Sequence, residues 1–176
     1  MNEREEKFFS IIKSRSDENK KAINLLLNER CYALIGAILR MELDSLIRVC
    51  YFNSVDLDKQ EKLLYNFFDS KKWGKSDREM VRQISEKLGW ASHIYDFCCA
   101  FIHLSPYHDW DSSSEIPNLT QERRSEIVKG IKAQQNKDWG YDPTLEIDEN
   151  FTFDDLILFT PHIFKKLREN LLCEMK

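Results

Sequence analysis

Apolar residues recur with a helical period along most of the chain. In residues 31–52, the densest stretch, they cover nearly every side of a helix. One stripe of charge interrupts them, because Arg40, Asp44 and Arg48 are four residues apart and share a face at about 3.6 residues per turn. A helix that is apolar almost all round belongs in the middle of a domain. We therefore expect a central helix here, with its charged stripe facing a groove, a partner helix or water.

The N-terminal part of the chain predicts two helices before the central one. Residues 3–14 form a short amphipathic pattern, and Ser16 is suited to be the N-cap of a second helix that runs to Glu29. No strong helix breaker separates that second helix from the central one. The alternative is that this second helix and the central helix form a single long helix with a bend near residues 28–30.

Two further helices are predicted after the central one. Asp56 or Asp58 can cap the first of them. The second opens with Ser76 and Glu79, which have the spacing of a capping box, and Gly89 is suited to end it.

The second half of the chain continues the helical pattern. Residues 91–104 form a second densely apolar helix, which Pro106 ends, and residues 121–135 form another. Thr152 can cap the last helix. Pro161 either kinks that helix or lies in the first turn of a new one.

Composition supports an all-α fold. Only 5 Gly and 4 Pro occur among 176 residues, which disfavours a turn-rich sheet. We predict a single-domain helical bundle of six or seven helices over residues 1–176. Its central bundle covers about residues 17–105, and C-terminal helices from about 120–176 pack on it.

Net charge and targeting signals limit the partners and the cellular location that we expect. The net charge of −4 gives no general attraction to nucleic acid or to an anionic membrane. The first residues lack the apolar core of a signal peptide, and no stretch approaches the roughly 20 apolar residues of a membrane span. We expect a cytoplasmic protein with no membrane contact, whose five cysteines are reduced core residues because they form no CxxC pair.

The charged stripe of the central helix is the first candidate site. A row of Arg40, Asp44 and Arg48 could hold a phosphate or a carboxylate, because guanidinium groups bind such anions in a fixed bidentate geometry. The simpler interpretation is a row of ion pairs within one helix.

A second polar stripe lies on the helix of residues 91–104. Its members, four, three and four residues apart, are Ser92, Asp96, Cys99 and His103. His103 could act as a general acid or base, or activate Cys99 as a nucleophile. It could also bond with the central helix, so that Asp96 and His103 join the charged stripe in one polar seam. A satisfied core histidine is the remaining interpretation.

Two weaker patterns are explained by simpler chemistry. His103, His108, Asp109 and Asp111 surround a bend, but their spacing is less regular than that of zinc ligands, so we expect no metal and no cofactor. Residues 121–137 carry a net charge of +3, and residues 138–155 carry −7. We expect the basic residues of the former, Arg123, Arg124, Lys129 and Lys132, to pair with the latter.

The stretches LIGAILRMELDSLIRVCYF and IYDFCCAFIHLSPYH together resemble the HEPN-like superfamily of helical bundles, particularly its uncharacterised members. The resemblance covers about residues 20–110. The residues that match on the first helix are Arg40, Asp44 and Arg48, and those on the second are Tyr95, Cys99, His103 and Ser105. The ribonucleases of that superfamily carry an Arg followed by four to six residues and a His, and no histidine here has that spacing.

The resemblance implies an all-α fold and a setting in bacterial defence or stress response. We expect a non-catalytic binding module whose anionic ligand or protein partner contacts Arg40, Asp44, Arg48, Asp96 and His103. The alternative is a metal-independent ribonuclease, in which His103 is the general base and Arg40 or Arg48 stabilises charge on the phosphate. The sequence leaves open whether the partner is another protein, RNA or a second copy of the chain in a homodimer.

Overall fold

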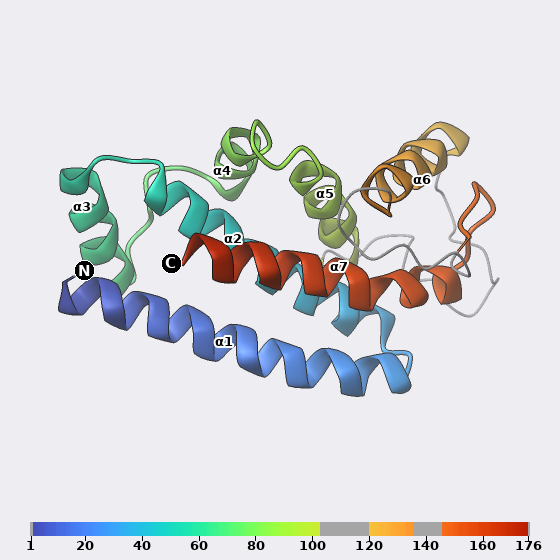
Figure 1. Ribbon diagram of the computed structural model, residues 1–176, viewed down its shortest axis with the longest axis horizontal. Coiled ribbons are helices and arrows are strands. Elements are labelled where there is room, and N and C mark those ends of the chain that lie inside the picture. The colour runs from blue at the N-terminus through green and yellow to red at the C-terminus, as the bar shows by residue number, and fades with distance from the viewer. Residues whose placement is uncertain (1, 103–119, 136–145, 176) are drawn as a thin grey trace.

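The computed structural model describes residues 2–102, 120–135 and 146–175 (Figure 1). These parts of the chain form seven helices and no strand, which confirms the predicted all-α bundle. The helices are α1 (Glu3–Asn28), α2 (Tyr32–Asn53), α3 (Leu57–Phe68), α4 (Asp77–Ile84), α5 (Ala91–Ile102), α6 (Gln121–Gln135) and α7 (Phe153–Glu174).

The central position predicted for residues 31–52 is confirmed by α2. This helix packs against α1, α4, α5 and α7, and most of its side chains are buried, among them Leu39, Leu43, Leu46 and Ile47 at 0% exposure. Figure 1 shows α1, α2 and α7 running lengthwise through the molecule, with α3, α4 and α5 following one another along one edge. The C-terminal helix α7 therefore belongs to the core, where Leu167 and Leu171 are fully buried.

An aromatic cluster closes the end of the bundle near the N-terminus. Phe8 of α1 is fully buried, and its ring centroid lies 5.4 Å from that of Phe52 on α2 and 5.0 Å from that of Phe67 on α3. Trp73, in the loop between α3 and α4, has its ring centroid 5.8 Å from that of Phe8. Aromatic pairs at such distances add to the apolar burial, so this cluster fixes the loop that leads into α4.

The N-terminal region is one helix where two were predicted, and the assignment of Ser16 as an N-cap was wrong. Ser16 is completely buried in the middle of α1, and its hydroxyl bonds to a side chain of α2 instead of capping a backbone. The chain does break between α1 and α2, where Arg30 has a φ of 51°. The single bent helix considered as an alternative is therefore also excluded.

Most of the predicted helix starts are confirmed. Asp56, not Asp58, caps α3, and Ser76 caps α4 in a capping box with Glu79. Gly89 does not end α4, because the helix stops at Ile84, whose carbonyl accepts the N–H groups of the following turn.

The last two described helices also begin where the sequence predicts. Helix α6 starts directly after Thr120, and Thr152 caps α7 in a capping box with Asp155. Helix α7 runs through Pro161 as a single helix, with the proline exposed. In the described ranges no helix is both long and apolar enough to cross a membrane.

Candidate functional site

The charged stripe of α2 forms ion pairs within the helix, as its spacing predicts. Arg48 donates from Nε to Oδ1 of Asp44 at 3.1 Å, and Nη1 of Arg40 lies 3.9 Å from the same oxygen. All three side chains are largely withdrawn from water, with exposed fractions of 11% for Arg40, 17% for Asp44 and 26% for Arg48. The stripe is therefore not a solvated surface row.

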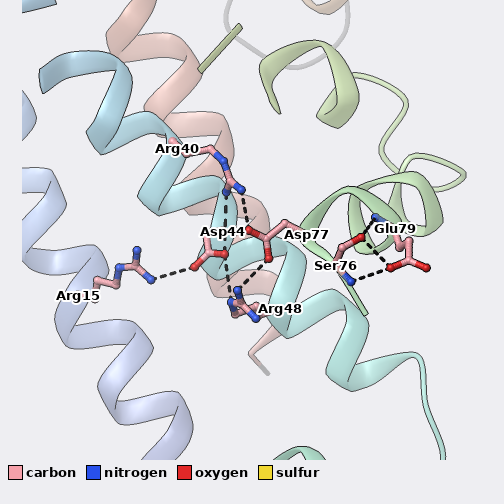
Figure 2. A network of polar contacts seen from close by, with 7 residues as sticks. All are labelled: Arg15, Arg40, Asp44, Arg48, Ser76, Asp77 and Glu79. Carbon is pink, nitrogen blue, oxygen red and sulfur yellow. Dashed lines mark hydrogen bonds and ion pairs between the residues drawn. The ribbon is translucent and has the colours of Figure 1, made fainter. Parts of the chain in front are cut away.

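A second carboxylate, from α4, completes the arrangement (Figure 2). Asp77 accepts a hydrogen bond from Nη2 of Arg40 on Oδ2 and one from Nη2 of Arg48 on Oδ1, both at 2.9 Å. Asp77 is the first residue of α4, directly after the N-cap Ser76. The capping box that starts α4 thus places this carboxylate opposite the two arginines, so the stripe faces a partner helix.

A third arginine, from α1, reaches one of these two carboxylates. Arg15 donates from Nη1 to Oδ2 of Asp44 at 3.2 Å, and its side chain is 38% exposed (Figure 2). We call Arg15, Arg40, Asp44, Arg48 and Asp77 the arginine–aspartate seam. Its three guanidinium groups and two carboxylates leave one unbalanced positive charge.

Helix α5 meets the seam through an aromatic ring. The guanidinium carbon of Arg40 lies 4.5 Å from the ring centroid of Tyr95, a cation–π contact. Burial opposes the charged form of Arg40, but the carboxylates of Asp44 and Asp77 outweigh it and raise the pKa of the guanidinium. Burial, together with Cys99, raises the pKa of the Tyr95 phenol, while Arg40 opposes the rise. Both groups therefore keep their ordinary charge at neutral pH.

The polar stripe of α5 is only partly described. Asp96 is exposed, and Cys99 is half-buried beside Arg40 and Tyr95. On α5, Tyr95 contacts Arg40 of the stripe through its ring. His103 lies outside the described residues, and so do His108, Asp109 and Asp111. The catalytic role considered for His103 remains a prediction, and the described residues contain no cluster of potential metal ligands.

The basic helix contacts the acidic segment in an unexpected way. Arg124 of α6 is buried, and it donates from Nη1 to the backbone carbonyls of Glu149 and Phe151 at 3.3 and 3.1 Å. Its guanidinium carbon also lies 5.3 Å from the ring centroid of Phe151. The predicted contact between the basic and the acidic segment therefore includes bonds from Arg124 to backbone carbonyls and its contact with an aromatic ring. The other basic residues of α6 described in full, Lys129 and Lys132, are exposed.

A second polar cluster, which the sequence analysis missed, joins α1, α2 and α7. Glu42 of α2 is fully buried, and its carboxylate accepts hydrogen bonds from Ser16 Oγ and, at 2.8 Å, from Asn19 Nδ2. Arg168 of α7 donates from Nη1 to Ser16 Oγ at 2.6 Å and from Nη2 to Asp17. We call these five residues the Glu42 cluster.

The sequence held a signal for this cluster. Glu42 lies two residues from Asp44, which places it on a different face of α2. An acid on an apolar face of a central helix must be buried, and a buried charge requires partners. The partners themselves could not be read from the sequence, because Ser16 and Arg168 are 152 residues apart.

Comparison with known proteins does not extend this description. The chain matches no protein-family model, no curated protein and no solved structure. The candidate function therefore rests on the geometry of the arginine–aspartate seam.

Proposed function

We propose that this chain is a non-catalytic, cytoplasmic binding module of HEPN-like type that recognises an acidic group at the arginine–aspartate seam. The HEPN-like part of the proposal is supported by the packing of the central helix α2 against α5, where Arg40 meets Tyr95. These are two of the residues that carry the resemblance in the sequence.

The unbalanced positive charge of the seam is the observation that carries the proposal. Two carboxylates neutralise two of the three guanidinium groups, and Arg15 and Arg48 are the more exposed of the three arginines. Both arginines bind Asp44, so their guanidinium groups converge. Among the described contacts, Arg15 uses one of its three nitrogens and Arg48 uses two. An incoming carboxylate can therefore bond to both without displacing Asp44.

The same geometry argues against a catalytic role for the arginines of the seam. Arg40 and Arg48, the residues considered for stabilising a phosphate, already bind Asp77. An arginine that supports a reaction must release that carboxylate first, at the cost of a buried unpaired charge. Recognition at the edge, through Arg15 and Arg48, has no such cost.

Binding of a short labelled peptide of glutamate residues tests the proposal. Fluorescence anisotropy at low salt should show binding to the wild type, and Arg15→Gln should weaken it about tenfold, equivalent to about 1.4 kcal/mol. Arg82→Gln is the matched control, because Arg82 is an exposed arginine of α4 outside the seam. Equal weakening by both variants would mean that the peptide responds only to net charge, and no binding by the wild type would reject the site.

A structural role for the seam is separable from a binding role. Arg48→Ala should weaken peptide binding in protein that still unfolds cooperatively. If Arg48→Ala lowered the melting temperature while the peptide bound normally, the seam would be a structural clamp.

The non-catalytic part of the proposal has its own test. Wild type and His103→Ala are incubated with mixed cellular RNA in the presence of a chelator, and we expect no cleavage by either. Cleavage by the wild type alone would contradict the proposal and establish the ribonuclease alternative.

A further inference from the structure

Two lysines lie at the ring of one buried tyrosine, at the corner where α2, α3 and α4 meet. The ammonium nitrogen of Lys59, from the first turn of α3, is 5.6 Å from the ring centroid of Tyr51 on α2. That of Lys75, from the loop before α4, is 5.2 Å from the same centroid. Three consecutive elements thus bring two positive charges to one aromatic ring.

Neither ammonium group forms a close ion pair with a carboxylate in the described part of the chain, although Lys75 and the Glu79 carboxylate attract one another electrostatically. Lys75 donates to Oε1 of Gln83 at 2.8 Å, a neutral acceptor. Lys59 forms no ion pair with any described residue. The nearby Asp56 accepts its backbone N–H instead. Two positive charges at one ring favour the binding of an anion near them.

The hydroxyl of Tyr51 is a further group without a partner. Tyr51 is 1% exposed, and its hydroxyl takes part in no hydrogen bond with any residue that the structure describes. A buried hydroxyl without a hydrogen bond is unfavourable and uncommon in native proteins. The phenol O–H donates a hydrogen bond, so an anionic oxygen is a suitable partner for it.

One more aromatic and one more cationic side chain lie near Tyr51. Trp73 has its ring centroid 6.3 Å from that of Tyr51, and Arg48 lies over Trp73 at 5.4 Å. Arg48 is paired with Asp44 and Asp77, so the two lysines are the cations of this corner that form no ion pair with a described carboxylate. The corner therefore combines two positive charges with a phenol donor, a combination that suits a small anion.

We propose that Lys59, Lys75 and Tyr51 form a binding site for a phosphate group. A phosphate dianion balances both ammonium charges, and its several oxygens accept hydrogen bonds from the ammonium groups and from the phenol. The site is separate from the arginine–aspartate seam and does not depend on the function proposed for it.

Calorimetric titration with inorganic phosphate tests the site directly. The wild type should bind, and Lys59→Gln/Lys75→Gln should raise the Kd at least about tenfold. Lys62→Gln/Lys72→Gln, which removes the same charge from exposed lysines of α3 and the adjoining loop, should leave the Kd unchanged. Arg15→Gln should also leave it unchanged, because that variant alters only the seam. Absence of phosphate binding by the wild type, or equal loss in both lysine variants, would overturn the proposal.

Tyr51→Phe provides a second test, in which the effect of the substitution on thermal stability depends on whether phosphate is present. Without phosphate the variant should melt at the same temperature as the wild type or higher, because it loses a hydroxyl that has no partner. With saturating phosphate the wild type should gain more thermal stability than the variant. A melting temperature lowered by Tyr51→Phe in the absence of phosphate, or equal gains with phosphate, would mean that the hydroxyl does not bind the anion.

The same titration distinguishes free phosphate from a phosphate group carried by a larger molecule. A nucleoside monophosphate is titrated in parallel with inorganic phosphate. Equal affinities identify a site for the free anion, whereas at least tenfold tighter binding of the nucleotide, lost in Lys59→Gln/Lys75→Gln, identifies a phosphate group carried by a larger molecule.

Discussion

Arg40 and Asp77 are 37 residues apart in the sequence, and Nη2 of Arg40 lies 2.9 Å from Oδ2 of Asp77. This contact joins the central helix α2 to the first residue of the short helix α4. Because the second oxygen of Asp77 binds Arg48 at the same distance, one carboxylate connects two turns of α2 to the start of α4. The orientation of α4 therefore depends on a bond to a single side chain as well as on its apolar face.

Asp77→Asn should lower the free energy of unfolding by about 1–3 kcal/mol, since two arginines lose a charged acceptor. Urea denaturation measures the change. Asp58→Asn is the control, because Asp58 also lies in the first turn of a helix but is exposed and forms no ion pair with a described residue. If both variants lost the same amount, the effect would come from the helix dipole rather than from the seam.

Glu42→Ala should lower the free energy of unfolding by about 3 kcal/mol, because Ser16 and Asn19 would keep buried donors without an acceptor. A double-mutant cycle with Asn19→Ala should give a coupling energy of at least about 1 kcal/mol. Additive effects would show that the bond between Asn19 and Glu42 does not contribute to stability.

The ion pair between Asp17 and Arg168 should make stability depend on pH in the acid range. The hydrogen bond from Arg168 is the main cause that lowers the pKa of Asp17 below its ordinary value of 3.8. A carboxyl with a lowered pKa in the folded state stabilises the protein above the pKa of the unfolded chain and loses that effect as the pH falls. The stability difference between the wild type and Asp17→Asn should therefore shrink as the pH is lowered through 3.8.

The same pair supplies the control for this measurement. In an Arg168→Gln background the effect of Asp17→Asn should not shrink in this way, because the bond that lowers the pKa is gone. An unchanged pH profile in that background would show that another group perturbs Asp17.

The cysteines should differ sharply in reactivity. Burial raises the pKa of the Cys50 thiol to about 12, whereas Cys173 is exposed. Because the thiolate is the reactive form, iodoacetamide at pH 8 should modify Cys173 in the native protein and Cys50 only after unfolding in urea. Mass spectrometry of timed samples measures both, and Cys173→Ser should remove the fast phase. Rapid native labelling of Cys50 would mean that α2 and α7 separate readily.

The parts of the fold that follow local rules could be predicted from the sequence. Asp56, Ser76 and Thr152 each cap a helix through a bond to a residue three positions later, so the signal lies within one turn. Ser16 is also of a residue type that is common at N-caps, yet its hydroxyl binds Glu42 on another helix. Nothing near Ser16 in the sequence distinguishes these two uses of a serine.

Only the α2 side of the arginine–aspartate seam could be predicted from the sequence. The spacing of Arg40, Asp44 and Arg48 revealed the stripe on α2, because four residues make about one turn. Asp77 resembles any acid in the first turn of a helix, and its role depends on how α4 packs against α2. A long-range partner of this kind requires the tertiary structure.

The bond between Arg168 and Ser16 closes a loop of 152 residues. At about 5–20 residues per second, a ribosome needs roughly 8–30 s to make that length of chain after Ser16 has been added. During that interval the α1–α2 hairpin can already form, with Ser16 and Asn19 on the carboxylate of Glu42 and the surface later covered by α7 still open to water. Nascent chains should therefore expose an apolar groove until α7 emerges, and a chaperone or a second nascent chain has those seconds in which to bind it.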